Sequence, residues 1–373
     1  MNESRTWESL SKVDRFVRIH FLFFTCLWPL LGAISVKPDL SIGELSALTV
    51  AALAYHLYAF VLNDVIDLPI DRTQPLRQQD PLVSGAITPA QALLLACSQP
   101  VIAVMPTLWL GGDVRAYAAL AVAFVAMAVY NVWGKRCPVP PFTDFMQGVG
   151  WGSLAIYAAF ALGLEPNAVT WLVFAYAVAY TLFMNGIHGG LRDLANDFAR
   201  GARTTAIFLG ARPAPDHRDP HVPAGVIVFA SAALIAQIAI AVTLIVRNDF
   251  GYGPAVYTVT AAAAVALGAA SLALMPIVMK PYAGAWDLAF RLQIYLVLMI
   301  LPILFIGAAN TAALALASLL KALSLAPLEW TIRIPQWLAG KTGLAGQTGL
   351  AAKTGLAGKT GLAGKTEFDQ GPS

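Results

Sequence analysis

Nine stretches of this sequence are apolar for long enough to cross a lipid bilayer. About 20 helical residues span a hydrocarbon core roughly 30 Å thick, and the runs lie at 16–36, 45–64, 89–110, 115–133, 145–164, 168–190, 222–246, 254–279 and 287–310. Because the bilayer core offers no water to pair with the backbone, only helices and closed barrels span it. Runs of this length suit helices, so the sequence predicts an all-α, polytopic membrane bundle of nine transmembrane helices.

The composition agrees with a membrane protein. Hydrophobic residues make up 58% of the 373 residues and charged residues only 12%, against about 45–50% and about 25% in soluble domains. The net charge of +3 is small and the basic residues are dispersed, so nothing indicates a nucleic-acid partner. Cys26, Cys97 and Cys137 are isolated, and their spacing predicts neither a disulfide framework nor a zinc site.

The chain divides into four parts. Residues 1–14 are polar and basic and lead into the membrane domain, 15–310. Residues 311–337 begin with an apolar stretch too short for a tenth span, which predicts a short interfacial helix or an extension of the ninth helix. Residues 338–373 repeat units such as LAGKTG. These units lack the glycine spacing of a phosphate-binding loop, and disorder suits them better than a β-helix of barely two coils.

Lysine and arginine alternate between the two sides of the predicted bundle. The connections after the odd-numbered helices hold only Lys37, Arg115 and Arg247. The amino end and the connections after the even-numbered helices hold Arg5, Lys12, Arg15, Arg18, Arg72, Arg77, Lys135, Arg136, Arg192, Arg200, Arg203, Arg212, Arg218 and Lys280. By the positive-inside rule, the amino terminus and the ends of helices two, four and six are predicted to be cytoplasmic.

Three carboxylates lie at the end of the second apolar run. Asp64, Asp67 and Asp71 are spaced i, i+3 and i+7, so on a helix they share one face, with Asn63 next to it. Pro69 disturbs the last turn, which leaves Asp71 either on the helix or in a loop. Because a charge at membrane depth costs several kcal/mol, three acids together indicate a functional site that binds a cation.

A second acidic turn follows the sixth apolar run. Asp193 and Asp197 are i, i+4 neighbours, with Arg192 and Asn196 beside them and Arg203 shortly after. Carboxylates repel phosphate unless Mg²⁺ lies between them, and Mg²⁺ is typically held by one or two carboxylates together with substrate phosphates. Arginine and lysine then complete the neutralisation. Acids in this basic company therefore predict a site for Mg²⁺ and a phosphate ester.

A phosphate held at a membrane helix end, with an apolar cavity behind it, describes an amphiphile with a lipid tail. An isoprenyl diphosphate fits, because Mg²⁺ and cationic side chains stabilise a departing diphosphate. The allylic carbocation left behind must be shielded from water, and aromatic faces stabilise it. Candidates facing the bundle are Tyr55, Tyr58, Trp151, Tyr157, Tyr176, Tyr180 and Trp286. For each of them, packing or an interfacial position is the commoner role.

Several motifs resemble one family. The stretch NDVIDLPIDR, from Asn63 to Arg72, resembles the NDxxDxxxD signature of the UbiA family of intramembrane prenyltransferases, and RDLANDFARGARTT is similar to its second Asp-rich motif. YNVWGKR, from Tyr130 to Arg136, is similar to the family's Tyr…Lys-Arg stretch at the end of helix four. Arg18-Ile19-His20 with Trp28-Pro29 resembles its opening. The resemblance covers about residues 15–310.

The resemblance implies Mg²⁺-dependent transfer of a prenyl group from its diphosphate to an acceptor, often aromatic. It also implies a central cavity open toward the cytoplasmic face and the lipid. By position, the residues implied to hold Mg²⁺ and diphosphate are Asn63, Asp64, Asp67, Asp71, Asp193 and Asp197. Those implied to bind substrate are Asn63, Arg72, Tyr130, Lys135, Arg136, Arg192, Asn196 and Arg203.

One departure from the family concerns the acceptor. Many members read Arg-Pro-Leu before Ser-Gly in the loop after the first motif, whereas this sequence reads Asp80-Pro81-Leu82-Val83-Ser84-Gly85. Arg77 is the only near substitute for the missing arginine. This difference weighs against an anionic acceptor such as a benzoate.

Two histidines are candidates for taking the proton that an acceptor loses on alkylation. His56 lies i−7 from Asn63 and so faces the same cavity from deeper in the helix, and His188 precedes the second acidic motif. Histidine suits general-base catalysis, although a buried, hydrogen-bonded histidine is the commoner finding.

Two other functions compete with prenyl transfer. A terpene cyclase on the same scaffold captures the cation with the substrate's own double bond and needs no acceptor. A transporter uses acids for ions or protons, but transporters usually place such residues near the middle of the membrane, often with internal repeats. Here the acids crowd one face beside arginine and lysine.

Overall fold

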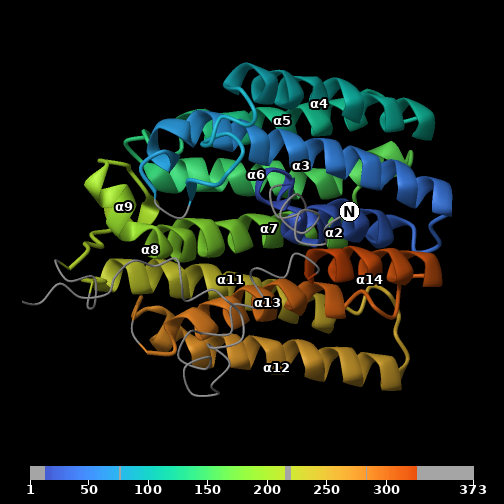
Figure 1. Ribbon diagram of the computed structural model, residues 1–373. Helices are drawn as coiled ribbons and strands as arrows, with labels where there is room; N and C mark the ends of the chain where they lie inside the picture. The colour runs from blue at the N-terminus through green and yellow to red at the C-terminus, as the bar shows by residue number, and fades with distance from the viewer. Residues whose placement is uncertain (1–12, 75–76, 215–219, 283, 326–373) are drawn as a thin grey trace, which may run out of the picture. The chain divides into compact units, whose positions relative to one another are not determined.

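Long helices run side by side through the part of the chain that the computed structural model describes, residues 13–74, 77–214, 220–282 and 284–325 (Figure 1). They are η1 (Ile19–Phe21), α2 (Leu22–Val36), α3 (Ile42–Asp71), α4 (Pro89–Leu110), α5 (Val114–Trp133), α6 (Pro140–Ala161), α7 (Ala168–Phe183), η3 (Met184–Gly189), α8 (Gly190–Arg192), α9 (Leu194–Ala199), α10 (Thr205–Phe208), α11 (Ala224–Arg247), α12 (Pro254–Val278), α13 (Trp286–Ile303) and α14 (Thr311–Leu325). The described residues contain no strand, only an isolated bridge between Arg212 and His221. The all-α prediction is confirmed. The predicted amino-terminal lead up to residue 12 and the repeat tail at 338–373 lie outside the described residues.

Eight segments of the described chain are long and apolar enough to cross a membrane, so the chain is an integral, multi-pass membrane protein. The eight are Ile19–Val36, Ile42–Asp71, Pro89–Leu110, Val114–Trp133, Ala168–Arg192, Ala224–Arg247, Pro254–Val278 and Trp286–Ile303. Each lies at one of the nine predicted positions. The remaining predicted span, 145–164, overlaps the 22-residue helix α6, which is not among the eight. The count of nine spans stays a prediction.

Helix α6 lies at the centre of the bundle, which explains its more polar sequence. It packs against α2, α5 and α7, and most of its residues from Gly148 to Ala161 are buried. Close approach needs small side chains: a Cβ on Gly32 of α2 would lie 2.3 Å from the carbonyl oxygen of Ala155. Because little of α6 faces lipid, it tolerates Asp144, which makes hydrogen bonds within the protein.

Helix α3 is longer than the predicted 45–64 and carries the first acidic cluster, Asp64, Asp67 and Asp71, on its final turns. A capping box starts it, in which Ser41 accepts a hydrogen bond from the Glu44 backbone and Glu44 accepts one from the Ser41 backbone. Pro69 lacks only one amide donor near the helix end, and the helix continues until the Arg72 amide donates to the Leu68 carbonyl at 3.1 Å. Of the two alternatives for Asp71, the structure therefore has the helical one.

The predicted span 168–190 is interrupted near its end. The regular helix α7 stops at Phe183, and a wider π-helical turn, η3, covers Met184–Gly189 before α8 begins. Such π-turns carry an inserted residue and occur often at functional sites. The second acidic cluster, Asp193 and Asp197, follows this irregularity: Asp193 lies between α8 and α9, and Asp197 lies on α9.

The chain after the ninth predicted span forms a separate helix. Helix α13 ends at Ile303, before the predicted 310, and α14 turns back to pack against α2, η1 and α3. The Ser324 hydroxyl accepts a hydrogen bond from the Phe23 amide at 3.0 Å. Residues 311–325 are thus a helix in its own right and not an extension of α13.

Candidate functional site

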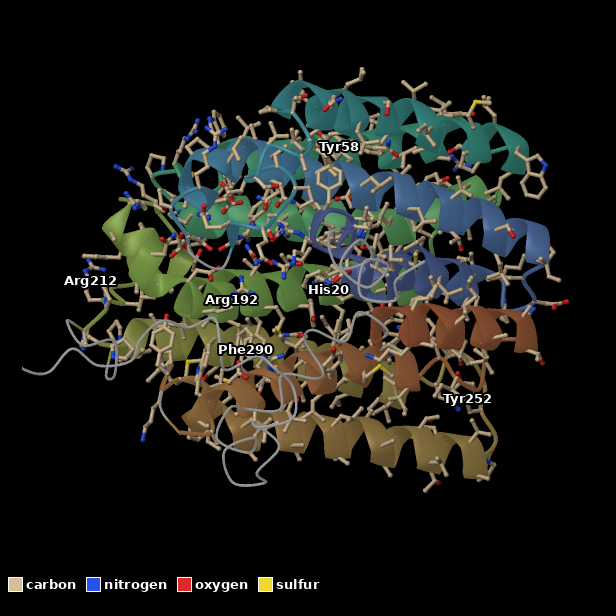
Figure 2. The ribbon with its side chains drawn as sticks, viewed as in Figure 1. His20, Tyr58, Arg192, Arg212, Tyr252 and Phe290 are labelled. Atoms are coloured by element: carbon tan, nitrogen blue, oxygen red, sulfur yellow. The ribbon has the colours of Figure 1, made fainter. Side chains whose placement is uncertain are left out.

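Lysine 135 joins the two acidic clusters. Its Nζ lies 3.2 Å from Asp67 Oδ2 at the end of α3 and 3.4 Å from Asp197 Oδ1 on α9. The Arg203 amide donates to the Lys135 carbonyl at 2.8 Å, which ties the loop after α5 to the chain beyond α9. Figure 2 shows nitrogen- and oxygen-bearing side chains gathered where the ends of α3, α8 and α9 meet, with Arg192 beside them. The two clusters therefore share one end of the bundle.

Arginines hold the first cluster from two other segments. Arg18, before η1, forms an ion pair with Asp64. Arg77, in the loop after α3, has Nη1 2.8 Å from Asp71 Oδ2 and 3.8 Å from Asp64 Oδ1. The side chain of Asp71 is only 4% exposed. Asn63 donates a long hydrogen bond of 3.4 Å to Asp67.

The two acids of the second cluster, Asp193 and Asp197, differ in how fully a neighbouring cation balances their charge. Arg192 makes a bidentate pair with Asp193, at 3.1 and 2.7 Å. Burial raises the pKa of Asp193, but Arg192 outweighs it, so this carboxyl has a pKa below its usual range. Burial dominates at Asp197 and raises the pKa of its carboxyl, against the opposing effect of Lys135. Asp197 Oδ1 is buried and makes no hydrogen bond of good geometry, although Lys135 lies 3.4 Å away.

The two central cations stay charged. Burial lowers the pKa of Lys135, but Asp67 and Asp197 raise it by more, so it lies above its usual value. The pKa of Arg77 is likewise raised, because Asp71, Asp64 and Asp80 outweigh burial. A small pocket lies where the segment before η1, helix α3 and the loop after α3 meet. It is lined by Arg15, Phe16, Asp64, Asp71, Arg77, Asp80, Pro81, Leu82 and Val83.

Within the described residues, the other side chains predicted to bind substrate do not pair with the acids of the two clusters. Arg72, Arg136 and Arg203 are exposed, and none of them pairs with an acid of the described chain. Asn196 Nδ2 is buried and has no hydrogen-bond partner among the described residues. The Tyr130 hydroxyl accepts a hydrogen bond from Asn185 at 3.0 Å.

Sequence reasoning missed four side chains. Arg18 was predicted only as a basic residue of the cytoplasmic side and as part of a family motif, because no local pattern pairs it with Asp64, 46 residues away. Asp144 is buried on α6, where Asn185 and Thr205 both donate to it. A single acid at the start of an apolar run was the available signal for Asp144. No sequence pattern indicated Asn185, and Thr205 was noted only as the last residue of the second family motif.

The two predicted proton acceptors differ in their contacts. The His56 ring uses both nitrogens, Nδ1 with Thr25 Oγ1 at 2.7 Å and Nε2 with the Val17 carbonyl at 2.7 Å. His188 is fully buried, its Nδ1 lies 3.2 Å from the Phe183 carbonyl, and its Nε2 has no partner in the described chain. Of the two, only His188 has a nitrogen available. The role of both as proton acceptors stays a prediction.

Aromatic side chains line up behind the first cluster. The Arg18 guanidinium lies 5.0 Å from the ring centre of Phe60. Phe60 contacts Trp151, and Phe24 contacts both Trp151 and Tyr180. Tyr157 and Tyr176 serve packing instead, because their hydroxyls bond Thr107 and the Val297 carbonyl respectively.

The donor set suits a hard divalent cation. All the acids and Asn63 offer oxygen, which Mg²⁺ prefers, and Asp197 Oδ1 is a buried oxygen without a hydrogen bond. No three acidic, histidine or cysteine side chains of the described residues converge closely enough to hold a metal alone. Because Mg²⁺ usually takes remaining oxygens from substrate phosphates and water, the residues fit a metal that binds together with a diphosphate.

Known proteins resemble this chain in sequence and in fold. The model of the UbiA prenyltransferase family matches residues 22–276. The 4-hydroxybenzoate octaprenyltransferase of Shewanella frigidimarina (strain NCIMB 400) is 27% identical over 210 residues, which are 55% of this chain and 69% of the relative.

Two solved structures extend the comparison to the fold. The apo structure of a UbiA homolog from Aeropyrum pernix K1 aligns with a TM-score of 0.57 at 18% identity, covering 79% of this chain and 97% of that one. A UbiA homolog from Archaeoglobus fulgidus bound to DMAPP and Mg²⁺ aligns with a TM-score of 0.53 at 15% identity, covering 78% and 99%. At these identities the likeness shows a common fold.

Proposed function

Because this chain belongs to the UbiA prenyltransferase family, we propose that it transfers an isoprenyl group from an isoprenyl diphosphate to an aromatic or other lipophilic acceptor. The observation that carries the proposal is Lys135, whose ammonium lies between Asp67 of the first cluster and Asp197 of the second. Acids and cations so arranged suit a diphosphate bound with metal ions, since each charge on the ligand meets an opposite charge.

In the proposed complex, Asp64, Asp67 and Asp71 with Asn63 hold metal on one side, and Asp193 and Asp197 hold it on the other. Bound Mg²⁺ would supply the positive charge that lets carboxylates and diphosphate share one site. The structure of the Archaeoglobus fulgidus homolog bound to DMAPP and Mg²⁺ supports a prenyl diphosphate and Mg²⁺ as the bound species.

The chain's own cations have a second task. Arg18, Arg77 and Lys135 are held by carboxylates. With those carboxylates occupied by metal, the three side chains would be free to contact phosphate oxygens. Arg72, Arg136 and Arg203 are already exposed and without an acid partner in the described chain, and they complete the neutralisation. Cationic donors fixed in this way stabilise the departing diphosphate.

The prenyl chain occupies the apolar side of the site. Phe60, Phe24, Trp151 and Tyr180 form a continuous aromatic surface behind Arg18 and Asp64. Their faces stabilise the allylic carbocation and exclude water from it. His188, with its free Nε2, takes the proton that the acceptor loses.

We place the site on the cytoplasmic side, together with the amino terminus. The support is the distribution of lysine and arginine, which favours the connections after α3, α5 and the α7–α9 segment over the alternate ones. Cysteine labelling from outside intact cells tests this side: a cysteine at exposed Arg136 should stay unlabelled, whereas one at exposed Arg115 on the opposite end should react.

The reaction itself is tested by product analysis. Membranes containing the protein receive Mg²⁺ and geranyl, farnesyl or geranylgeranyl diphosphate, with and without phenols such as the 4-hydroxybenzoate used by the named relatives, and the products are identified by mass spectrometry. Prenylated phenol supports the proposal. A cyclic hydrocarbon or terpene alcohol formed without acceptor would instead establish a terpene cyclase.

Asp64→Ala and Asp193→Ala should abolish turnover while the protein still folds. Near-normal turnover in both variants would remove the metal–diphosphate assignment.

A further inference from the structure

Behind Tyr130 lies a buried hydrogen-bonded chain that links four helical segments. The Asn185 amide nitrogen, in the π-helical turn η3, donates to the Tyr130 hydroxyl at 3.0 Å and to Asp144 Oδ1 at 2.8 Å. The hydroxyl of Thr205, at the start of α10, donates to Asp144 Oδ2. Asp144 and Thr205 are 6% and 1% exposed. The chain thus runs from α10 through α6 and η3 to the end of α5.

Each bond in this chain fixes the direction of the next. An ionised carboxylate only accepts hydrogen bonds, so Asp144 requires the NH₂ end of the Asn185 amide to face it. The same nitrogen reaches Tyr130, so there the tyrosine oxygen is the acceptor. The Tyr130 proton must therefore point elsewhere, and it has no acceptor among the described residues.

The Tyr130 phenol lies within electrostatic reach of the charged site. The Tyr130 phenol interacts electrostatically with Asp67 of the first cluster and with Arg192 beside the second. A phenolic O–H directed there is a donor suited to a diphosphate oxygen, on which negative charge grows as the bond to the prenyl group breaks.

The backbone is built to allow this arrangement. A π-turn inserts one residue into a helix, and here the turn contains Asn185. The next residue is Gly186, where a Cβ would lie 2.9 Å from Asp144 Oδ2. A glycine at 186 leaves the space that Asp144 needs to reach Asn185.

We infer that Asn185 and Asp144 are positioning residues that hold the Tyr130 hydroxyl as a donor to the diphosphate. This inference rests on the proposed function for its ligand, and neither residue touches the substrate itself. This role also accounts for the π-turn, because a regular helix through 184–189 would point the side chain of residue 185 in another direction.

A double-mutant cycle tests the inference. Asn185→Leu keeps the side-chain size and removes both hydrogen bonds, and Tyr130→Phe removes the hydroxyl. Each should lower kcat about tenfold with little change in the KM for the prenyl diphosphate, because the lost bond strengthens only as charge develops. The double variant should be no slower than Tyr130→Phe, since both substitutions remove the same donor.

Asn185→Asp gives a sharper result. The new carboxyl group at 185 and Asp144 would share one proton, because two buried carboxylates this close do not both ionise. The other oxygen of the carboxyl at 185 would then accept the Tyr130 proton and withdraw it from the diphosphate, so this variant should fall to the level of Tyr130→Phe although the hydroxyl is still present. Asn131→Leu is the matched control: Asn131 is the neighbour of Tyr130, is buried, and donates to the Ala59 carbonyl at 3.0 Å. Its effect should add to that of Tyr130→Phe. Additive losses for Asn185→Leu with Tyr130→Phe, or unchanged kcat in Asn185→Leu, overturn the inference.

A binding measurement separates this inference from the proposed reaction. Inorganic pyrophosphate with Mg²⁺ is titrated into the detergent-solubilised full chain, and binding is followed by the shift in melting temperature. Free pyrophosphate carries the full charge of the departed group, so the Tyr130 hydrogen bond is at its strongest with this ligand. Tyr130→Phe, Asn185→Leu and the double variant should therefore weaken pyrophosphate binding by the same factor. That pattern supports the network even if no prenylated product is found, whereas unequal factors contradict it even if the enzyme is active.

Discussion

Arg77 Nη1 lies 2.8 Å from Asp71 Oδ2, and this ion pair fastens the loop after α3 to the last turn of the helix. Asp71 is almost fully buried. Removing one partner of a buried pair leaves the other charge uncompensated, which costs about 3–5 kcal/mol. Arg77→Ala should therefore lower the melting temperature clearly, and Arg77→Lys should lower it less. Thermal unfolding in detergent checks this, and equal melting temperatures for Arg77→Ala and the unaltered protein would contradict it.

Lys135→Met should decrease turnover by about 10²–10³, the range found when one donor to a developing anion is removed. The variant keeps the length of the stem but leaves Asp67 and Asp197 without the ammonium between them. The same loss should increase the stabilisation that Mg²⁺ gives in a thermal-shift titration, because the metal now relieves unscreened repulsion between the two carboxylates. Lys135→Arg, which keeps the charge, is the control. An unchanged Mg²⁺ response in Lys135→Met would argue against metal binding between the clusters.

Asp197→Asn should make the protein more stable without metal and inactive with it. Burial raises the pKa of Asp197 in the folded state, so its charged form is held at a cost at neutral pH. A raised carboxyl pKa favours folding below the unfolded value of about 3.9, and the favourable contribution is lost as pH rises through the folded pKa. The melting temperature of Asp197→Asn should thus exceed that of the unaltered protein at pH 7, and the difference should vanish near pH 4.

The exposed pair of Asp249 with Arg247 provides the control for that experiment. Such pairs contribute at most about 1 kcal/mol, so Asp249→Asn should change the melting temperature little at either pH. Destabilisation by Asp197→Asn at pH 7 would contradict the prediction. It would mean that the ion pair with Lys135 outweighs the cost of burying the Asp197 charge.

Acceptors without a carboxylate should be preferred. Asp80 occupies the loop position where many family members have arginine, and it lies 3.9 Å from Arg77 and 3.8 Å from Arg15. Its charge repels a benzoate and occupies the arginines that would bind one. A neutral phenol should be prenylated faster than 4-hydroxybenzoate, and Asp80→Arg should reverse that order. Competition between the two acceptors, measured by mass spectrometry, gives the ratio directly; a preference for 4-hydroxybenzoate in the unaltered protein would contradict the argument.

Apolar length was enough to predict most of this fold. Eight spans lie where the runs predicted them, because a bilayer imposes helices on any such segment. Length alone misjudged the ends: α3 continues to Asp71 since Pro69 removes only one hydrogen bond, and α13 stops at Ile303. The glycines at 186, 189 and 190 allow a kink near the π-turn at Met184–Gly189 but do not specify its type. The return of α14 onto α2 has no local pattern that predicts it.

Only those parts of the candidate site whose residues are close in sequence could be predicted. Asp64, Asp67 and Asp71 share a helix face, so their grouping follows from their spacing. The partners of these acids come from distant segments: Arg18 lies 46 residues before Asp64. Such pairs depend on how the helices pack, which a single sequence does not encode in any local period. The Asp144–Asn185–Tyr130 chain is of the same kind.

The contact between α14 and α2 limits how far the chain can be trimmed for crystallography. Ser324 accepts the Phe23 amide, which lies in the first turn of α2 and has no carbonyl below it in that helix. A protein ending at Ile303 would leave this buried donor facing hydrocarbon, and α2 would fray where Arg18 must meet Asp64. Shortened versions intended for diffraction should therefore retain Ser324.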